Sequence, residues 1–213
     1  MNNEREGISE LTTGRLSVYL RCLTYLESQG EKTVSSAELA ERFHLNSAQI
    51  RKDLACFGEF GTRGVGYDVS RLKHTLVDTL GLNIARHVLI AGAGNLGMAL
   101  ADYAGFNNNG FHIVAIVDAD PEKVGRASRQ GIPVLDAARL SEIVRRNRID
   151  IGIIAVPAES AQTVCDAFSS HGINAILNFA PVQIKVPSGV KLKSVDLRIN
   201  LESLSFHLKN AEG

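Results

Sequence analysis

Three glycines form the part of this sequence best suited to binding a phosphate. Gly92, Gly94 and Gly97 follow the spacing Gly-x-Gly-x-x-Gly, directly after an apolar run at 88–91 that is typical of a buried strand. Between a strand and a helix, this spacing permits a tight turn, lets a pyrophosphate approach the backbone and allows close helix–strand packing. The pattern predicts a phosphate-binding turn that leads into a helix over 98–103, whose positive end would face the diphosphate.

A carboxylate stands where a dinucleotide-binding sheet needs one. The next predicted strand, 111–117, ends at Asp118, which lies 21 residues beyond Gly97. An acid in this place accepts hydrogen bonds from a ribose diol, and it would repel the 2′-phosphate of NADP. The sequence therefore favours NAD(H) as the ligand.

Loops after two later predicted strands, 149–156 and 175–177, should reach the same edge of the sheet. The carboxyl ends of parallel strands are where such sheets bind ligands, so these loops are expected to line the nicotinamide end, with ordinary strand-ending turns as the alternative. Together with the glycine turn and the acid, the predicted cofactor contacts are Gly92, Ala93, Gly94, Asn95, Leu96, Gly97, Asp118, Val156, Pro157, Asn178, Phe179 and Ala180.

A second group of residues suits contact with DNA. In a helix that opens at Asn46, the residues Ile50, Leu54 and Phe57 share one face and should pack inward. The opposite face combines alanines, which let the backbone approach base edges, with long polar side chains that reach bases or phosphates. The residues assigned to DNA from this helix are Ser47, Ala48, Gln49, Arg51 and Lys52.

The elements around that helix must hold it at a steep angle to its neighbour. Ser35 and Glu38 have the spacing of a capping box, so a preceding helix starts there, and a break of only two residues, 44–45, separates it from the next helix. Two short helices joined in this way form a helix-turn-helix. A plain helical bundle with a solvated basic face is the alternative.

The segment 59–69 holds two short β-prone runs joined by a glycine-rich tip that carries Arg63. A hairpin directly after a recognition helix is a wing, and an arginine at its tip could enter an adjacent minor groove. The predicted architecture is α/β, with a winged helix-turn-helix over 1–80, a parallel dinucleotide-binding sheet over 81–198 and a tail helix over 199–213. Leu201, Leu204 and Leu208 make that helix apolar, so it should be buried on its own domain or on a partner chain.

Composition narrows the class of protein. The chain is 45% hydrophobic, its formal net charge is zero, and residues 42–73 hold six Lys or Arg against three acids. There is no signal-peptide pattern, and the longest apolar run, 151–158, is too short to span a bilayer. Three well-separated cysteines, Cys22, Cys56 and Cys165, fit a reducing cytosol and give no metal-site spacing. A soluble, cytoplasmic protein without a metal site is expected.

Several segments together closely resemble the Rex family of bacterial redox-sensing repressors. The likeness runs from about residue 11 to 208 and includes the run Arg-Lys-Asp-Leu at 51–54, the glycine-rich wing, the glycine turn and Asn-Phe-Ala-Pro at 178–181. It implies a winged helix-turn-helix followed by a Rossmann-type domain, in a homodimer whose C-terminal helices are exchanged between subunits. It also implies a repressor, not an enzyme, that binds a palindromic operator in double-stranded DNA and releases it when NADH binds, while NAD+ permits DNA binding.

The same resemblance implies a switch. Arg21 matches an arginine of the family's first helix, Tyr103 a tyrosine after the glycine turn that also contacts the cofactor, and Asp196 an acid before the tail helix. These groups would exchange partners between two states and so link the charge of the nicotinamide to the angle between domains. Two departures from the family pattern are Cys56, where many members have tyrosine, and Leu197, where some place an aromatic residue against the nicotinamide.

Two other functions compete with this interpretation. An NAD-dependent dehydrogenase would need an acid–base group near the nicotinamide, but the only histidine after Asn178 is His207, on the tail helix. A sheet of this kind could instead bind coenzyme A, although Asp118 would repel the 3′-phosphate of that ligand. Competition between NADH and coenzyme A would separate the two ligands.

Overall fold

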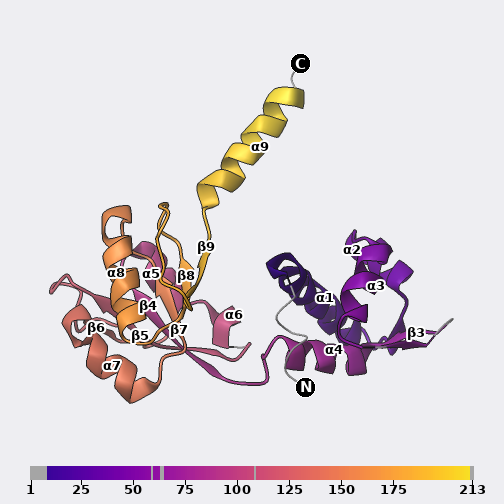
Figure 1. Ribbon diagram of the computed structural model, residues 1–213, viewed down its shortest axis with the longest axis horizontal. Helices are drawn as coiled ribbons and strands as arrows, with labels where there is room; N and C mark the ends of the chain where they lie inside the picture. Colours follow the sequence, from indigo (N-terminus) through magenta and orange to yellow (C-terminus); the bar gives the residue numbers. More distant parts are fainter. Residues whose placement is uncertain (1–8, 59, 63–64, 108, 212–213) are drawn as a thin grey trace. The chain divides into compact units, whose positions relative to one another are not determined.

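The computed structural model describes residues 9–58, 60–62, 65–107 and 109–211. The chain divides into two compact units, Met1–Ile84 and Ala85–Gly213 (Figure 1). Each unit encloses its own apolar core, a single cluster in the first and one cluster on each face of the sheet in the second. The DNA-binding and nucleotide-binding patterns of the sequence therefore fall in separately packed parts of the chain.

The first unit is a helical core with a small sheet at its edge. Leu16, Leu23 and Leu26 are buried on one stripe of the first helix, which begins after the capping residue Ser9. The elements are α1 (Glu10–Ser28), β1 (Thr33–Val34), α2 (Ser36–Phe43), α3 (Ser47–Ala55), β2 (Gly61–Thr62), β3 (Gly66–Asp68) and α4 (Val69–Thr79).

The predicted helix-turn-helix is present as α2 and α3. Ser35 and Glu38 form the capping box, since the Ser35 hydroxyl accepts from the Glu38 amide and the Glu38 carboxylate accepts from the Ser35 amide. His44 ends α2 in the left-handed conformation, with φ 54°, and Asn46 caps α3 by accepting from the Gln49 amide. The capping box thus starts α2, while the left-handed His44 and the Asn46 cap set the sharp turn between the helices.

The wing is part of a three-stranded antiparallel sheet in the order β1-β3-β2. Gly61 pairs with Tyr67 and Thr62 with Gly66, so β2 and β3 make the predicted hairpin, while β1 adds a strand that the sequence pattern did not indicate. The predicted tip residue, Arg63, lies outside the described residues, as does Glu59.

The second unit is built on a six-stranded parallel sheet in the order β6-β5-β4-β7-β8-β9. The strand order reverses between β4 and β7, as in a Rossmann-type fold. Its elements are β4 (Arg86–Ala91), α5 (Asn95–Ala101), α6 (Ala104–Asn107), β5 (Phe111–Asp118), β6 (Val134–Asp136), a 3₁₀ turn (Ala137–Arg139), α7 (Leu140–Asn147), β7 (Ile151–Ile154), α8 (Ala158–Ser170), β8 (Ala175–Asn178), β9 (Lys191–Ser194) and α9 (Leu197–Ala211).

Some predicted boundaries were wrong. The helix expected over 98–103 is α5, which starts directly after Gly94 and ends at Ala101, because the glycine turn itself supplies the first helical residues. Tyr103 therefore lies beyond that helix. The edge strand β9 was not predicted, since only Leu192 of its four residues is partly buried and the other three are exposed polar residues.

The tail helix α9 has no buried residue among those described. It begins two residues before the predicted boundary at 199, directly after Asp196. Its large apolar side chains are 60–66% exposed, and they are Leu197, Ile199, Leu201, Leu204, Phe206 and Leu208. The helix is thus not buried on its own unit, which was one of the two places expected for it. Within the described part of the chain, no helix has both the length and the apolar character needed to cross a membrane.

Candidate functional site

The carboxyl edge of the parallel sheet surrounds a cavity of about 560 Å³. It opens where the strand order reverses, beside the ends of β4 and β7, which is where open α/β sheets bind ligands. Five predicted cofactor residues line it: Gly92, Gly94, Asp118, Val156 and Pro157. The cavity thus joins the glycine turn, the acid after β5 and the loop after β7 in one site.

The three glycines of the turn differ in what a side chain at each position would meet. Gly92 has φ 104°, and a side chain there would collide with the carbonyl oxygen of Ala155. A Cβ at Gly97 would collide with the carbonyl oxygen of Gly92, so this glycine lets α5 pack on the turn. Gly94, by contrast, has no atom beyond its neighbours in sequence within 4 Å of where its Cβ would lie. Packing within the unit does not require glycine at 94, whereas a ligand lying against the backbone there would.

The acid after β5 is tied to the glycine turn. One Asp118 oxygen accepts from the Ala93 amide at 2.7 Å, and the other accepts from the Asp120 amide at 2.9 Å. Lys123 Nζ lies 3.3 Å from the same carboxylate. Burial acts to raise the pKa of Asp118, but these hydrogen bonds and the lysine outweigh it, so the pKa is held below its usual value. The carboxylate is therefore ionised and fixed beside the turn.

The loop after β8 lies at the same edge but turns its polar side chain inward. Asn178 is fully buried, and its amide group donates to the carbonyl oxygens of Ala180 and Val182 and accepts from the Ala180 amide. Phe179 packs against the core cluster around Ile90. These predicted contact residues shape the loop, and none of them is among those that line the cavity.

The remaining predicted cofactor residues lie in the glycine turn, on α5 or shortly after it. Ala93 is half-buried in the turn, and Asn95 and Leu96 are exposed in the first turn of α5. Tyr103 is 58% exposed and stacks edge-on against Phe106 at a ring distance of 5.0 Å. They surround the turn without lining the cavity.

Sequence reasoning missed several residues that line the cavity. Lys123, which pairs with Asp118, is the most informative, because its position five residues after the acid in a short polar loop was a usable signal. Others come from the first half of α8, whose pattern gave no sign of a ligand; they are Glu159, Ser160, Thr163 and Val164.

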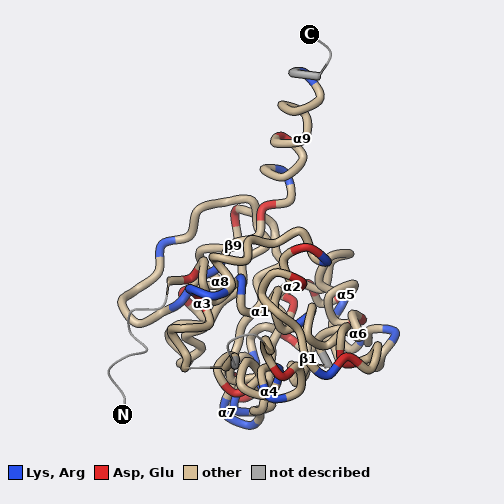
Figure 2. The backbone as a smooth tube through the Cα atoms, turned by 90° about the vertical axis from the view of Figure 1, so that its right-hand side faces the viewer, with Lys and Arg blue, Asp and Glu red and all other residues tan. Residues whose placement is uncertain are grey.

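Five of the residues assigned to DNA lie on α3 as predicted. Ala48, Arg51 and Lys52 are exposed, and Ser47 and Gln49 are half-buried at the start of the helix. Arg51 donates to the Ser36 hydroxyl at 3.0 Å, which links α3 to α2. Lys or Arg and Asp or Glu positions are interspersed along the described parts of both units (Figure 2). The exposed polar side chains of α3 make this helix the candidate for base contacts.

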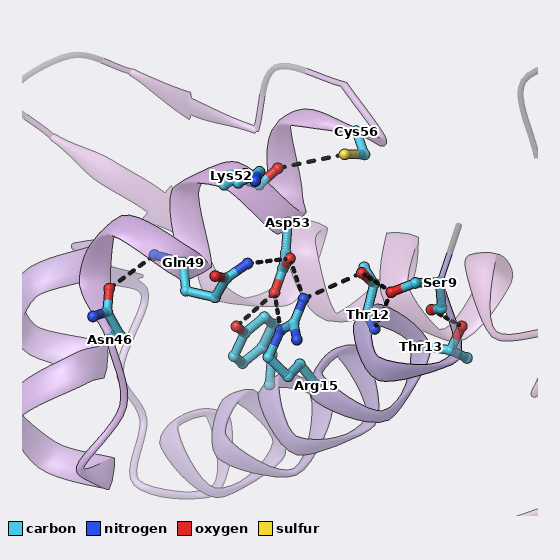
Figure 3. A network of polar contacts seen from close by, with 10 residues as sticks. Ser9, Thr12, Thr13, Arg15, Asn46, Gln49, Lys52, Asp53 and Cys56 are labelled. Carbon is cyan, nitrogen blue, oxygen red and sulfur yellow. Dashed lines mark hydrogen bonds and ion pairs between the residues drawn. The ribbon is translucent and has the colours of Figure 1, made fainter. Parts of the chain in front are cut away.

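The buried polar contacts of an acid on α3 were not recognised from the sequence. Asp53 is only 3% exposed and accepts hydrogen bonds from Arg15 and Tyr19 of α1 and from Gln49 of α3 (Figure 3). The available signal was its spacing of three from Ile50, which places it beside the buried face of the helix. An acid on that face needs buried partners.

The residues proposed for a switch are divided between the units. Arg21 is exposed on α1 of the first unit, while Tyr103 and Asp196 belong to the second. Asp196 lies directly before α9 and accepts from the Arg198 amide at 2.9 Å. The exchange of partners among these three groups stays a prediction.

Comparisons with known proteins match both units. Residues 83–182 match the family described as "CoA binding domain", and residues 7–55 match the family described as "Putative DNA-binding protein N-terminus". A redox-sensing transcriptional repressor Rex of Pelotomaculum thermopropionicum is 49% identical over 205 residues, covering 96% of each chain.

Solved structures of repressors with the same fold also match nearly the whole chain. The crystal structure of RSP in complex with NAD+ and operator DNA is 38% identical, with a TM-score of 0.91 over 96% of this chain and 94% of that one. RSP in complex with NADH is 37% identical, with a TM-score of 0.87 over 97% and 96% of the two chains. With this similarity in sequence and in both units of the fold, the chain belongs to the Rex family of redox-sensing transcriptional repressors.

Proposed function

We propose that this protein is a transcriptional repressor that senses the NADH/NAD+ ratio and releases its operator when NADH binds. The observation that carries the proposal is the presence, in one chain, of a helix-turn-helix with a wing and of a sheet-edge cavity that joins an open glycine to an ionised acid. The solved relative RSP, whose fold matches both units, is described with NAD+, with NADH and with operator DNA.

The residues around the cavity fit a dinucleotide. The open space above Gly94 accommodates a pyrophosphate against the backbone, and Asp118 offers an ionised acceptor for a ribose diol. Val156 and Pro157 would line the path toward the nicotinamide, which supplies the redox difference that is sensed. The remaining predicted contacts, from Ala93, Asn95, Leu96, Gly97, Tyr103, Asn178, Phe179 and Ala180, complete the proposed site.

In the proposed complex with DNA, α3 enters the major groove of a palindromic operator. Ser47, Ala48, Gln49, Arg51 and Lys52 would contact bases and phosphates, and Arg63 of the wing would reach the adjacent minor groove. A palindrome requires a two-fold partner, and the exposed apolar face of α9 supplies a surface that a second subunit would bury. We place this homodimer, with its tail helices exchanged, in the cytoplasm.

Fluorescence anisotropy of a labelled palindromic operator tests the proposal. The protein is titrated into the DNA at fixed salt, and NADH, NAD+ and NADPH are then added separately. We expect NADH to release the DNA at low concentration, NAD+ to permit binding, and NADPH to act weakly because Asp118 repels its 2′-phosphate. Binding to DNA that none of the three ligands reverses would contradict the sensor function, and absence of binding would contradict the role of α3.

Coenzyme A is the second candidate ligand, because the family that matches residues 83–182 is described by that ligand. The ionised carboxylate of Asp118 disfavours it, since the 3′-phosphate would approach a negative charge. Competition separates the two ligands: protein loaded with NADH is titrated with coenzyme A while NADH fluorescence is followed. Displacement at equal or lower concentrations would favour coenzyme A.

A further inference from the structure

A buried acid on the recognition helix α3 receives four hydrogen bonds. Arg15 donates to both Asp53 oxygens, from Nε to Oδ2 at 2.6 Å and from Nη2 to Oδ1 at 2.8 Å. The Tyr19 hydroxyl donates to Oδ2 at 2.9 Å, and Gln49 Nε2 donates to Oδ1 at 2.8 Å (Figure 3). Three of the four donors come from α1, so the carboxylate is held by the helix behind α3.

The carboxylate stays ionised in this setting. The hydrogen bonds from Arg15 lower the pKa of Asp53, burial opposes them, and the bonds from Gln49 and Tyr19 lower it further. An ionised carboxylate only accepts hydrogen bonds. The side-chain amide of Gln49 must therefore turn its nitrogen toward Asp53 and its oxygen away, because two facing oxygens would repel each other.

Gln49 is held at both its backbone and its side chain. Its backbone amide donates to Asn46 Oδ1 at 2.9 Å, and its side chain is tied to Asp53 one helical turn further on. The flanking residue Ala48 is exposed and small, which leaves the start of α3 accessible. The N-terminal residues of a recognition helix are those that contact base edges. Gln49 thus has a fixed order of donor and acceptor before DNA arrives, so little of its freedom is lost on binding.

We propose that Asp53 is a positioning residue that sets which base Gln49 reads. This inference rests on the proposed DNA-binding function of α3. With one amide hydrogen given to Asp53, Gln49 retains its oxygen and a second N–H, the pair that matches the N6 amine and N7 of adenine. A guanine edge offers two acceptors, and one of them would face the amide oxygen. The Asp53–Gln49 pair therefore selects adenine over guanine in the major groove.

The test measures operator affinity with each base pair changed in turn, at fixed salt, for the full-length protein. The variants are Gln49→Ala, Asp53→Asn and the double variant. We expect the unmodified protein to prefer adenine by about 10- to 100-fold at one symmetric pair of positions. Gln49→Ala should abolish that preference at the same positions. Asp53→Asn should reduce it, because an amide can turn either its oxygen or its nitrogen toward Gln49. The double variant should lose no more than Gln49→Ala alone.

Tyr19→Phe is the matched control. It removes one hydrogen bond from the same carboxylate but leaves the charge of Asp53 and its bond to Gln49. This variant should lose stability and keep the adenine preference. Binding of NADH, measured by its fluorescence, reports whether the second unit is intact in each variant.

A measurement without any variant keeps the proposal testable if Asp53→Asn does not fold. The adenine is replaced by 7-deazaadenine, which lacks N7, or by purine, which lacks the N6 amine. Each replacement should weaken binding of the unmodified protein to the level of the guanine operator.

Three results would overturn the inference. Asp53→Asn could weaken binding equally on all operators and keep the adenine preference, which would make Asp53 structural only. Gln49→Ala could leave the preference for each base of the operator unchanged. The protein would then still recognise its operator, but the Asp53–Gln49 pair would not direct that recognition. If the unmodified protein did not bind the operator at all, that result would contradict both the proposed function and this inference.

Discussion

Gly94 differs from the other two glycines of its turn in what a side chain would meet. A methyl group at 94 enters open space, and φ there is −80°, which alanine adopts without strain. We expect Gly94→Ala to leave the melting temperature of the free protein unchanged and to weaken NADH binding about tenfold or more, because the methyl group occupies the place of the pyrophosphate. NADH fluorescence titration with calorimetric melting measures both quantities.

Gly97→Ala is the contrasting variant, since its methyl group would collide with the carbonyl oxygen of Gly92. It should lower the melting temperature of the second unit as well as the affinity. Equal affinities for NADH in Gly94→Ala and the unmodified protein would place the phosphates elsewhere.

Single residues were predicted best where the local pattern determines their role. The spacing of the glycines and of Asp118 located the cavity, since each has a role set by its neighbours in sequence. Asn178 and Asp53 were harder, because the direction of a buried polar side chain depends on partners from distant segments. A sequence shows that Asp53 needs a donor, but not that Arg15 supplies it.

The contact between α1 and α3 should respond to pH at both ends of the scale. Burial, followed by the bond to Asp53, raises the pKa of Tyr19 to about 12, so its contribution is complete below pH 10 and is lost as pH rises toward 12. The lowered pKa of Asp53 acts in the opposite direction: its contribution is complete above roughly pH 5 and is lost as pH falls through the carboxyl range below about 4.

Guanidinium unfolding followed by circular dichroism between pH 3 and 12 measures both limits. We expect the first unit to lose about 2 kcal/mol of stability between pH 10 and 12 through this tyrosine. Tyr19→Phe, which has no hydroxyl to ionise, should lack that loss. A parallel alkaline decline in both proteins would show that other groups cause it.

Among the helices and strands, those with a long apolar pattern or an adjacent turn signal, such as the glycine-rich hairpin of β2 and β3, were the ones that could be predicted. The apolar runs of β4 and β5 were recognised, because several successive apolar residues mark a buried strand. The short strands β1 and β9 were not, since two or four residues carry too little pattern and both depend on pairing with distant strands.

The apolar side of α9 should be the main contact between subunits. Burying each leucine contributes about 1.5–3 kcal/mol, so replacing Leu201 and Leu204 together by Glu should dissociate the proposed dimer and abolish tight operator binding. Sedimentation velocity measures the mass of the particle. Lys209→Glu, a charge change on the same exposed helix, is the control and should leave the dimer intact. A dimer that survives the double change would place the interface elsewhere.

The proposed coupling between cofactor binding and operator binding requires both units of the chain. A full reversal from DNA-bound to free needs NADH to prefer one state by roughly 5 kcal/mol. Asp196→Asn removes the charge of the proposed switch and keeps an oxygen that can accept from the Arg198 amide. We expect this variant to bind NADH and operator nearly as well as the unmodified protein, but NADH should release the DNA at least tenfold less effectively.

Anisotropy measured with and without NADH checks this coupling. Glu202→Gln, which breaks the ion pair with Arg198 in the same helix, is the control. Undiminished release by NADH in Asp196→Asn would refute the switch.

The order of the elements along the chain has a consequence for synthesis on the ribosome. The first unit is complete at Ile84, and domains fold as units from the N-terminus. The parallel sheet must wait for its distant strands, because its central strand β4 pairs with both β5 and β7. The tail helix α9 emerges after all six strands of that sheet. In the proposed dimer, an unfinished chain would hold a folded recognition helix without the means to pair across a palindrome, so incomplete products would not block the operator.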